Sequence, residues 1–566
     1  MKEKIVKALP YILIALVALA SVSFFVDSNY IGGHDYSYHA ASIEGKAGGS
    51  FLNIFTGKIY GVMANDLGYG EGLFYPPFAH SASALILKTI RHFGANDVYL
   101  AMKITFFLIL FFAGVFMRKL ILLLTKNRRV AILSAFFYIT FPYILTDIIV
   151  RCAMAECALF MFMPLVLIGL YYLFHEEYKK FLPFFVVGCV GMIHSHLMMT
   201  LFFVGFCILG FLPSIKLFLK KKKILFLALS IVITTLISLP FLLPMLENKA
   251  HTDYKVFEDG FMSNAISVDL WRVPIGRYLS LDGSVAASSD TPVTPVYISF
   301  IGLLAIIYAV FRYKKIKSKD NNPFLIFSIV IAILGLLCST TLLSWEMMPK
   351  TLLLIQFPWR LLTFVALGST IAVGLSLPTF EKQTCSDIVI AVIALSAIIS
   401  IARVNSFAYN NLKIAVPATE LKSLAADNAD YLPTISPGAS SNTFIRDYDP
   451  IKIVADNKDT VVLSINNSVP NLDFEISNVS QKTTLTLPRI YYLGYNIEAE
   501  YDDGSKESLP YEMSEHGFIN IYVDKDAKIR VTYPGTKLQR ISYWVASLTT
   551  VASIIFYIYL YKRKRA

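Results

Sequence analysis

Apolar runs of about 20 residues recur along almost the whole chain, and they limit its fold more than any other feature. A helix that crosses a membrane needs roughly 20 such residues, and clusters of lysine and arginine separate the runs. Charged residues make up 16% of the 566 residues, whereas soluble domains have about 25%. The pattern therefore predicts an α-helical polytopic membrane protein.

The basic clusters give each expected crossing a direction, because lysine and arginine stay on the cytoplasmic side. The expected spans are 1–26, 98–117, 130–146, 158–174, two short helices within 181–218, 225–246, 296–311, 324–343, 352–377, 388–401 and 541–561. This gives about twelve spans with both termini in the cytoplasm. The N-terminus begins like a signal sequence, but its apolar run is long enough to span, so we expect an uncleaved first helix. Charge allows only one crossing between 76 and 117, so we expect 76–90 to be re-entrant or interfacial.

Two polar loops and one longer polar region divide the chain into three parts. A transmembrane domain, 1–402, is expected to carry outer loops at 27–97 and 247–295. Residues 403–540 show apolar–polar alternation, many β-branched and aromatic residues, and turn signals at Asp502-Asp503-Gly504 and Pro534-Gly535, which predicts an extracytoplasmic all-β domain. Residues 541–566 form the last span and a basic cytoplasmic tail.

The net charge of +11 comes from the clusters between apolar runs, so we expect no nucleic-acid partner. The six cysteines lie in or beside apolar runs without CxxC spacing, which favours neither a disulfide framework nor a metal cluster. The chain also lacks a Walker loop, a dinucleotide-binding glycine motif and a nucleophile elbow.

The first polar segment, Gly32 to Pro77, is the best candidate for chemistry. If Asp35 begins a helix, His39 lies one turn later on the same face, and a carboxylate beside an imidazole is a plausible general base. The alternative is a solvated loop whose acid caps an interfacial helix. His34, Asp35 and His39 could supply three metal ligands, but their spacing matches no zinc signature. A magnesium ion that bridges Asp35 and a phosphate is a further alternative.

Asp147, Arg151 and Glu156 interrupt apolar sequence between two expected spans. Ionisable groups at membrane depth are costly, and they usually pair with one another or line a cavity. A structural ion pair and a functional site both fit this pattern.

Arg360 follows Trp359 at the start of a span and lies one or two turns into the apolar phase. A guanidinium at this depth needs an anion, either a nearby carboxylate or the phosphate of a lipid-linked substrate. Trp359 suits the membrane interface. His194 and His196 split a long apolar run, and we expect them in an outer turn between two short helices.

These segments together resemble the GT-C class of membrane glycosyltransferases. The resemblance rests on Gly33-His34-Asp35 after the first helix, Leu73-Phe74-Tyr75-Pro76-Pro77 at the end of the first loop, a basic return, and the acids and base of 147–156. More narrowly, GHDYSYHAASIEG, DIIVRCAMAE and LIQFPWRLL are similar to bacterial membrane proteins labelled 6-pyruvoyl-tetrahydropterin-synthase-related and to YfhO-like sugar transferases. PRIYYLGYNIEAEYDDG is similar to the end of YfhO-like chains. The second outer loop lacks an Asp-x-Asp, which puts a metal requirement in doubt.

The resemblance implies inverting transfer of a sugar from a polyprenyl-phosphate donor, for modification of cell-envelope glycans. The acceptor would be a glycan, lipid or protein at the outer face of a bacterial cytoplasmic membrane. Asp35 matches the catalytic acid of the first loop and would act as the base. No metal ligands are assigned, and a Mg²⁺ or Mn²⁺ cofactor stays open. The expected substrate-binding residues are His39, Glu44, Tyr75, Arg151, Glu156, His194, His196 and Arg360.

A non-enzymatic transporter or flippase of a lipid-linked saccharide is the main alternative, with Asp35 and Arg360 on the translocation path. Transporters often contain internal repeats, and this sequence shows no convincing one, which counts against that alternative. A third possibility is a structural protein that displays the outer β domain.

Overall fold

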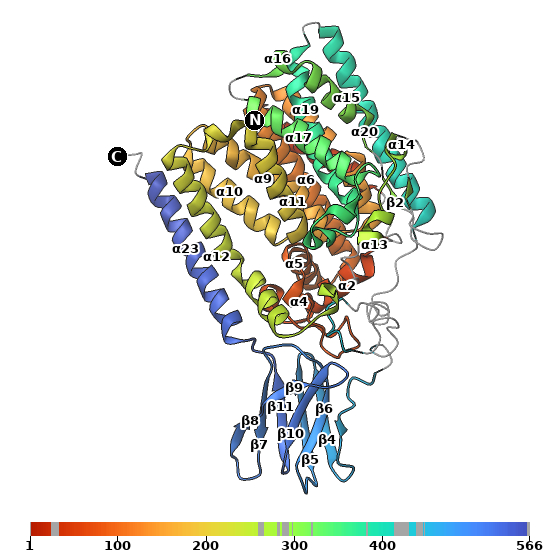
Figure 1. Cartoon of the computed structure of the whole chain (residues 1–566), viewed down its shortest axis with the longest axis vertical. Helices are drawn as coiled ribbons and strands as arrows, with labels where there is room; N and C mark the ends of the chain where they lie inside the picture. The colour runs from red at the N-terminus through yellow and green to blue at the C-terminus, as the bar shows by residue number, and fades with distance from the viewer. Residues whose placement is uncertain are drawn as a thin grey trace.

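The computed structural model shows a helical bundle joined at one end to a β sandwich (Figure 1). The residues it describes are 2–23, 33–258, 265–279, 284–285, 294–296, 298–318, 321–380, 383–412, 430–436, 445 and 448–562. The expected end of the first span at 24–26, parts of both outer loops, residues 413–429 and 437–444 of the predicted β domain, and the tail 563–566 lie outside these residues.

Among the described residues, eight helical segments are long and apolar enough to cross a membrane. They are α6 (Val98–Thr125), α9 (Met154–Phe174), α11 with η3 (Leu197–Phe211, Leu212–Leu217), α12 (Lys221–His251), α17 (Asn322–Ser339), α19 with η6 and η7 (Pro358–Leu361, Leu362–Ser376, Leu377–Thr379), α20 (Gln383–Asn411) and α23 (Lys537–Lys562). A ninth span forms if α7 (Arg128–Ile139) is joined to α8 (Pro142–Leu145) and the π-helix η2 (Thr146–Arg151), across a bend of 48°.

The other three expected spans are helical, but among the described residues they do not meet the length and composition of a crossing helix. They are α1 (Lys2–Ser21), α10 (Tyr178–Ile193) and α15 (Phe300–Phe311). Every expected run is thus helical, although length and composition support eight or nine spans rather than about twelve. Two boundaries also differ from the expected ones, because α20 continues through Arg403 to Asn411 and α23 already begins at Lys537.

Two helices form the centre of the bundle. In the most apolar 18-residue stretch of α9, and in that of the α19 segment, 94% of the residues are buried. The corresponding shares are 28% in α12 and 11% in α23. A helix that is apolar on all sides belongs inside a bundle, so α6, α7, α10 and α17 pack around α9 and α19. The outer helices α12 and α23 run side by side towards the sheets (Figure 1).

The C-terminal part is built of β strands, which confirms the predicted all-β fold, and its two sheets form a β sandwich. Its strands are β3 (Val454–Ala455), β4 (Val461–Ser468), β5 (Asn471–Ser477), β6 (Thr483–Ile490), β7 (Asn496–Glu500), β8 (Lys506–Ser508), β9 (Tyr511–Met513), β10 (Phe518–Val523) and β11 (Ala527–Thr532). They form antiparallel sheets in the orders β3-β6-β10-β9 and β4-β5-β11-β7-β8. The predicted Asp502-Asp503-Gly504 turn joins β7 to β8. The Pro534-Gly535 turn leads into α23, with Gly535 at φ +74°.

The first outer loop supplies short helices between the bundle and the sandwich (Figure 1). They are α2 (Tyr36–Gly48), α3 (Asn53–Thr56), α4 (Glu71–Phe74) and α5 (Phe78–His92). The remaining short elements are η4 (Lys255–Phe257), α13 (Ala265–Leu270), α14 (Ile275–Leu279), β1 (Ser284–Val285), β2 (Thr294–Pro295), α16 (Tyr313–Ile316), η5 (Trp345–Met347) and α18 (Lys350–Leu353). The C-terminal end of α23 lies away from the sheets (Figure 1).

Candidate functional site

The start of the first loop is fixed to the end of η2 by its backbone. The amide of His34 donates to the carbonyl of Val150 (3.1 Å), and the amide of Asp35 donates to the carbonyl of Arg151 (3.0 Å). A Cβ atom on Gly33 would lie 2.5 Å from Cβ of Cys152, so a larger residue does not fit there without a shift. The backbone therefore holds Asp35 beside Arg151.

Asp35 is the N-cap residue of α2, which confirms the predicted helix. Its side chain accepts no capping hydrogen bond, and within the described ranges its carboxylate makes no hydrogen bond or ion pair. His39 lies one turn later but is buried, and its ring contacts His80 rather than Asp35. The expected acid–imidazole pair of Asp35 and His39 does not form.

Two arginines and two acids make a charged cluster, which we define as Asp147, Arg151, Glu156 and Arg360. Nη1 of Arg151 contacts Asp147 Oδ1 and lies 2.6 Å from Glu156 Oε2. Nε of Arg360 lies 3.3 Å from the same oxygen of Glu156. Tyr143 donates a hydrogen bond to Glu156 Oε1 (2.8 Å). The ion-pair alternative thus holds for Arg151, whose charge is met by two buried carboxylates.

Arg360 is less completely paired than Arg151. Its Nη1 donates to the carbonyl of Ile355 and to Gln356 Oε1, both at 2.9 Å. Its Nε approaches Glu156 without the geometry of a hydrogen bond, and Nη2 makes no hydrogen bond to any described residue. Arg360 therefore has donors available for a further anion.

Trp359 does not face lipid, in contrast to its expected place at the membrane interface. Only 2% of the residue is exposed. Its ring stacks on Phe357 (4.9 Å between centroids), and the guanidinium of Arg151 lies 4.7 Å from its centroid. A buried cation gains from an aromatic face, which explains why the ring turns inward.

His194 and His196 lie between α10 and α11, as predicted, but they serve different surroundings. Burial lowers the pKa of His194 to about 4, and the charge of Lys58 adds to the effect. His196 instead lies near the charged cluster, where Arg360 and Glu156 act on it. Only His196 of this pair therefore belongs to the neighbourhood of Arg360.

A second polar group, the histidine chain, consists of Glu71, His80 and His39. Glu71 Oε1 lies 2.8 Å from His80 Nδ1, and His80 Nε2 lies 2.7 Å from His39 Nδ1. All three residues are at most 1% exposed. Tyr75 stacks on His80 with centroids 4.9 Å apart. Burial raises the pKa of Tyr75, and the charges of Asp35 and Glu71 raise it further.

Sequence reasoning missed Glu71 and His80, although both interrupt otherwise apolar or aromatic surroundings. It placed His39 and Tyr75 at the site, and the structure brings both to the histidine chain.

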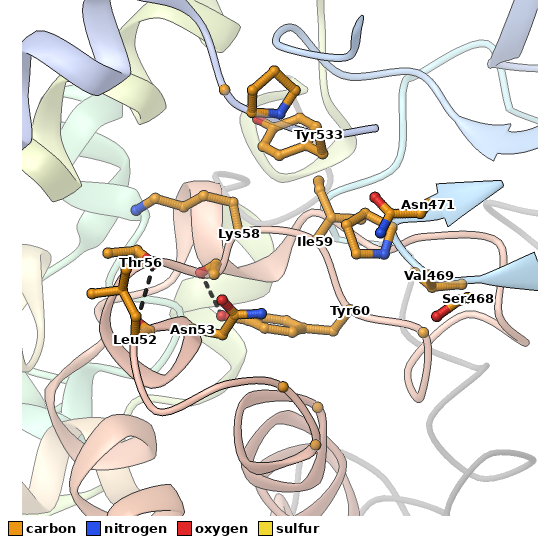
Figure 2. Close-up of a pocket in the computed structure, with 18 of the residues that line it drawn as sticks. Leu52, Asn53, Thr56, Lys58, Ile59, Tyr60, Ser468, Val469, Asn471 and Tyr533 are labelled. Atoms are coloured by element: carbon orange, nitrogen blue, oxygen red, sulfur yellow. Dashed lines mark hydrogen bonds between the residues drawn. The ribbon is translucent and has the colours of Figure 1, made fainter. Parts of the chain in front are cut away.

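Glu44 faces away from Asp35. Its Oε2 lies 2.5 Å from Nη2 of Arg91, and it lines a cavity of about 1060 Å³ between the first loop, the sandwich and α23. Figure 2 shows this cavity, with Lys58 and Tyr60 on one side and Asn471 on the other. Two polar groups of its wall already have hydrogen-bond partners within the protein. Tyr60 donates to the carbonyl of Gly57 (2.5 Å), and Lys58 donates to the carbonyl of Pro240 (2.9 Å).

Among the described residues, the candidate ligands are already engaged or lie apart. Over the described ranges, no group of three or more His, Cys, Asp or Glu side chains is arranged to hold a metal. Asp147 and Glu156 already neutralise arginines, and Nδ1 of His39 is engaged by His80. The three donors considered in the first loop, His34, Asp35 and His39, do not come together as ligands.

No protein-family model matches the chain, and no curated protein matches it. Among solved structures, the chain is similar to an oligosaccharyltransferase of Archaeoglobus fulgidus in its apo form, with 12% identity and a TM-score of 0.46 over 73% of this chain and 57% of that one. It is also similar to the complex of that enzyme with Zn and sulfate, with 15% identity and a TM-score of 0.43 over 72% and 54%. The chain thus spans little more than half the length of these proteins, and the likeness concerns fold alone.

Proposed function

We propose that this chain transfers a sugar, with inversion, from a polyprenyl-phosphate carrier to an acceptor hydroxyl, and that Asp35 is the general base. The observation that carries this proposal is the position of Asp35. Its carboxylate has no partner among the described residues, yet its backbone is bonded to the carbonyl of Arg151, beside the charged cluster.

The location of the cluster supports the proposal. Arg151 ends the bent span, Glu156 is in the first turn of α9, and Arg360 precedes α19. A lipid-borne phosphate can reach the ends of membrane helices from the bilayer, and a water-borne acceptor can approach from the loop side. A carboxylate placed between the two approaches suits a reaction that joins both substrates.

The proposed reaction needs a base and positive charge. Asp35 takes the proton of the acceptor hydroxyl, the oxygen bonds to the anomeric carbon, and the bond from that carbon to the phosphate oxygen breaks. Polyprenyl phosphate leaves with the bonding electrons. A positioned base contributes about 10²–10⁴-fold, and preorganised donors stabilise the charge on the leaving oxygen. Arg360 suits the second role better than Arg151, because two carboxylates already neutralise Arg151.

No step is assigned to a metal, and a Mg²⁺ or Mn²⁺ ion, if bound, would bridge Asp35 and the donor phosphate. His39, Glu44, Tyr75, Glu156, His194 and His196 remain predicted substrate contacts. We further propose that the protein resides in a bacterial cytoplasmic membrane, with both termini in the cytoplasm and the β sandwich outside. There the sandwich would help to position a cell-envelope glycan, lipid or protein acceptor.

A test of this function separates transfer from transport. Mass spectrometry of lipid extracts and envelope glycans should show that a deletion strain accumulates the polyprenyl-phosphate sugar and loses one glycan substituent. The purified protein in detergent, mixed with these extracts, should then transfer the sugar, because a flippase needs a membrane and an enzyme does not. Unaltered glycans in the deletion strain would contradict the proposal. Restoration that needs a sealed bilayer, without transfer in detergent, would favour the flippase.

A further inference from the structure

The histidine chain lies close to Asp35, but the reaction proposed above does not use it. Glu71 is in α4, His80 is in the first turn of α5, and His39 is on α2 one turn after Asp35. Helices α2 and α5 pack against each other, which brings the two imidazoles together. Three polar side chains from three helices thus meet in a place almost closed to solvent.

The charge state of the chain follows from its surroundings. Burial alone would raise the pKa of Glu71, but its hydrogen bond with His80 and the charges of Lys46 and Lys58 act to lower it below its ordinary value. Burial lowers the pKa of His39 well below its ordinary value, and the charge of Arg151 adds to this effect. Glu71 is therefore ionised and His39 neutral near pH 7.

The hydrogen bonds then fix which ring nitrogens carry protons. An ionised carboxylate only accepts, so Nδ1 of His80 must donate to Glu71. When His80 is neutral, its Nε2 has no proton and accepts, so Nδ1 of His39 must donate to it. A neutral His39 with a proton on Nδ1 leaves Nε2 as a lone-pair acceptor.

The rings around the chain hold this arrangement in place. Tyr75 stacks on His80, and Tyr38 meets the edge of His39 with centroids 5.3 Å apart. Nε2 of His39 has no hydrogen-bond partner among the described residues. It is also not one of their fully enclosed unpartnered atoms, although His39 as a whole is only 1% exposed.

We propose that Glu71 and a neutral His80 set the tautomer of His39, so that His39 Nε2 accepts a hydrogen bond from a hydroxyl group of the sugar acceptor. This rests on the proposed function, which supplies an acceptor with several hydroxyl groups. One hydroxyl gives its proton to Asp35, and a neighbouring one donates to His39. Glu71 and His80 are positioning residues, because they act through His39.

The tautomer can be measured without any enzyme assay. The full chain, labelled with ¹⁵N-histidine and embedded in lipid bilayers, is examined by NMR near pH 7.5. The signals of His39 are assigned by their loss in His39→Gln. We expect a protonated, pyrrole-type Nδ1 and an unprotonated, pyridine-type Nε2. A protonated Nε2 in the wild-type protein would overturn the proposal, even if no variant folds.

Glu71→Gln tests the origin of the tautomer, because an amide can donate to His80 as well as accept from it. We expect signals of the opposite His39 tautomer to appear. We also expect the KM for the acceptor to rise roughly 2- to 10-fold, as for the loss of one hydrogen bond, with a smaller change in kcat. His92→Gln is the matched control, since His92 is exposed at the other end of α5.

Unchanged His39 signals in a folded Glu71→Gln protein would contradict the role of Glu71. An unchanged KM together with altered signals would contradict the contact with the acceptor. Absence of any transfer by the wild-type protein would instead refute the proposed function, while the NMR result on the tautomer would stand.

Discussion

The charged cluster and the histidine chain are both buried and polar, but they are built differently. In the cluster, two guanidinium groups face two carboxylates, and Glu156 alone contacts both arginines. The histidine chain is linear and begins at one carboxylate, Glu71, with Lys46 and Lys58 as charged neighbours. Among the described residues, the chain ends at an unpartnered nitrogen.

This difference predicts that the charged cluster mainly affects stability, whereas the histidine chain mainly affects which atom meets a substrate. A closed set of buried charges is sensitive to the loss of any member, because removal leaves an uncompensated charge. A linear chain has a direction, so it can control which atom is presented at its end. Asp35 belongs to neither group by its side-chain contacts, although backbone bonds hold it next to the cluster.

The largest expected effect comes from Asp35→Asn, which keeps size and shape but removes the basic carboxylate. Turnover should fall by about two to four powers of ten, while insertion and donor binding stay nearly unchanged. Transfer by purified protein, with donor binding measured separately, checks this. Asp502→Asn, in the exposed β7–β8 turn, is the control. Wild-type turnover in Asp35→Asn would remove this residue from the mechanism.

Glu156→Gln tests whether the cluster is as closed as the contacts indicate. The substitution leaves Arg151 and Arg360 with less opposite charge, so the free energy of unfolding should fall by about 3–5 kcal/mol. Thermal unfolding in detergent measures the loss. Glu71→Gln, at the start of the histidine chain, should cost less. Equal losses in the two variants would show that the chain is as structural as the cluster.

Arg360→Lys addresses the member of the cluster that has donors available. Lysine keeps the charge but loses the planar fork that binds phosphate at two points. The apparent affinity for the polyprenyl-phosphate donor should fall by about 10-fold, with Arg530→Lys on the exposed face of β11 as the control. If donor affinity does not change, the contact of Arg360 with Glu156 is its main role.

The smallest effect is on how stability depends on pH. Below about pH 6.5 the unfolded chain protonates His39 but the folded chain does not, because burial lowers the folded pKa. Stability should therefore fall with pH in that range. His194, with a pKa of about 4, acts in the same direction. Asp430, whose pKa burial raises to about 6, opposes them.

His39→Gln removes one of these contributions. Melting temperatures between pH 7 and pH 5 should fall less steeply in this variant than in the wild-type protein. Parallel curves would show that the pKa of His39 is the same in the folded and the unfolded protein, which would contradict the lowering of its pKa by burial.

Hydropathy and charge predicted most of the fold, because each helical run is encoded locally. The exact number of spans differs, because among the described residues α10 and α15 are apolar but only 16 and 12 residues long. Alternation and turn residues similarly predicted the strands around Asp502-Asp503-Gly504. The prediction ended the span of α20 at residue 401, because the sequence becomes polar there, whereas the helix continues past Arg403 to Asn411.

The site was predictable only where its residues are close in sequence. Arg151 and Glu156 lie five positions apart, and an ion pair of Arg151 with Glu156 or Asp147 was one of the two alternatives that the sequence left open. Glu71 and His80 are nine positions apart in different helices, and His39 and His80 are 41 apart, so no periodic pattern links them. The choice of His80 over Asp35 as the partner of His39 depends on the packing of α5 against α2.

The close approach of Gly33 to Cys152 has a consequence for specificity. A methyl group at position 33 would have to displace one of the two segments, because its place lies 2.5 Å from the Cβ of Cys152. Such a displacement would change the spacing between the Asp35 carboxylate and Arg360 without altering either side chain. In the proposed mechanism, the spacing between base and cation would therefore depend on a residue that has no side chain.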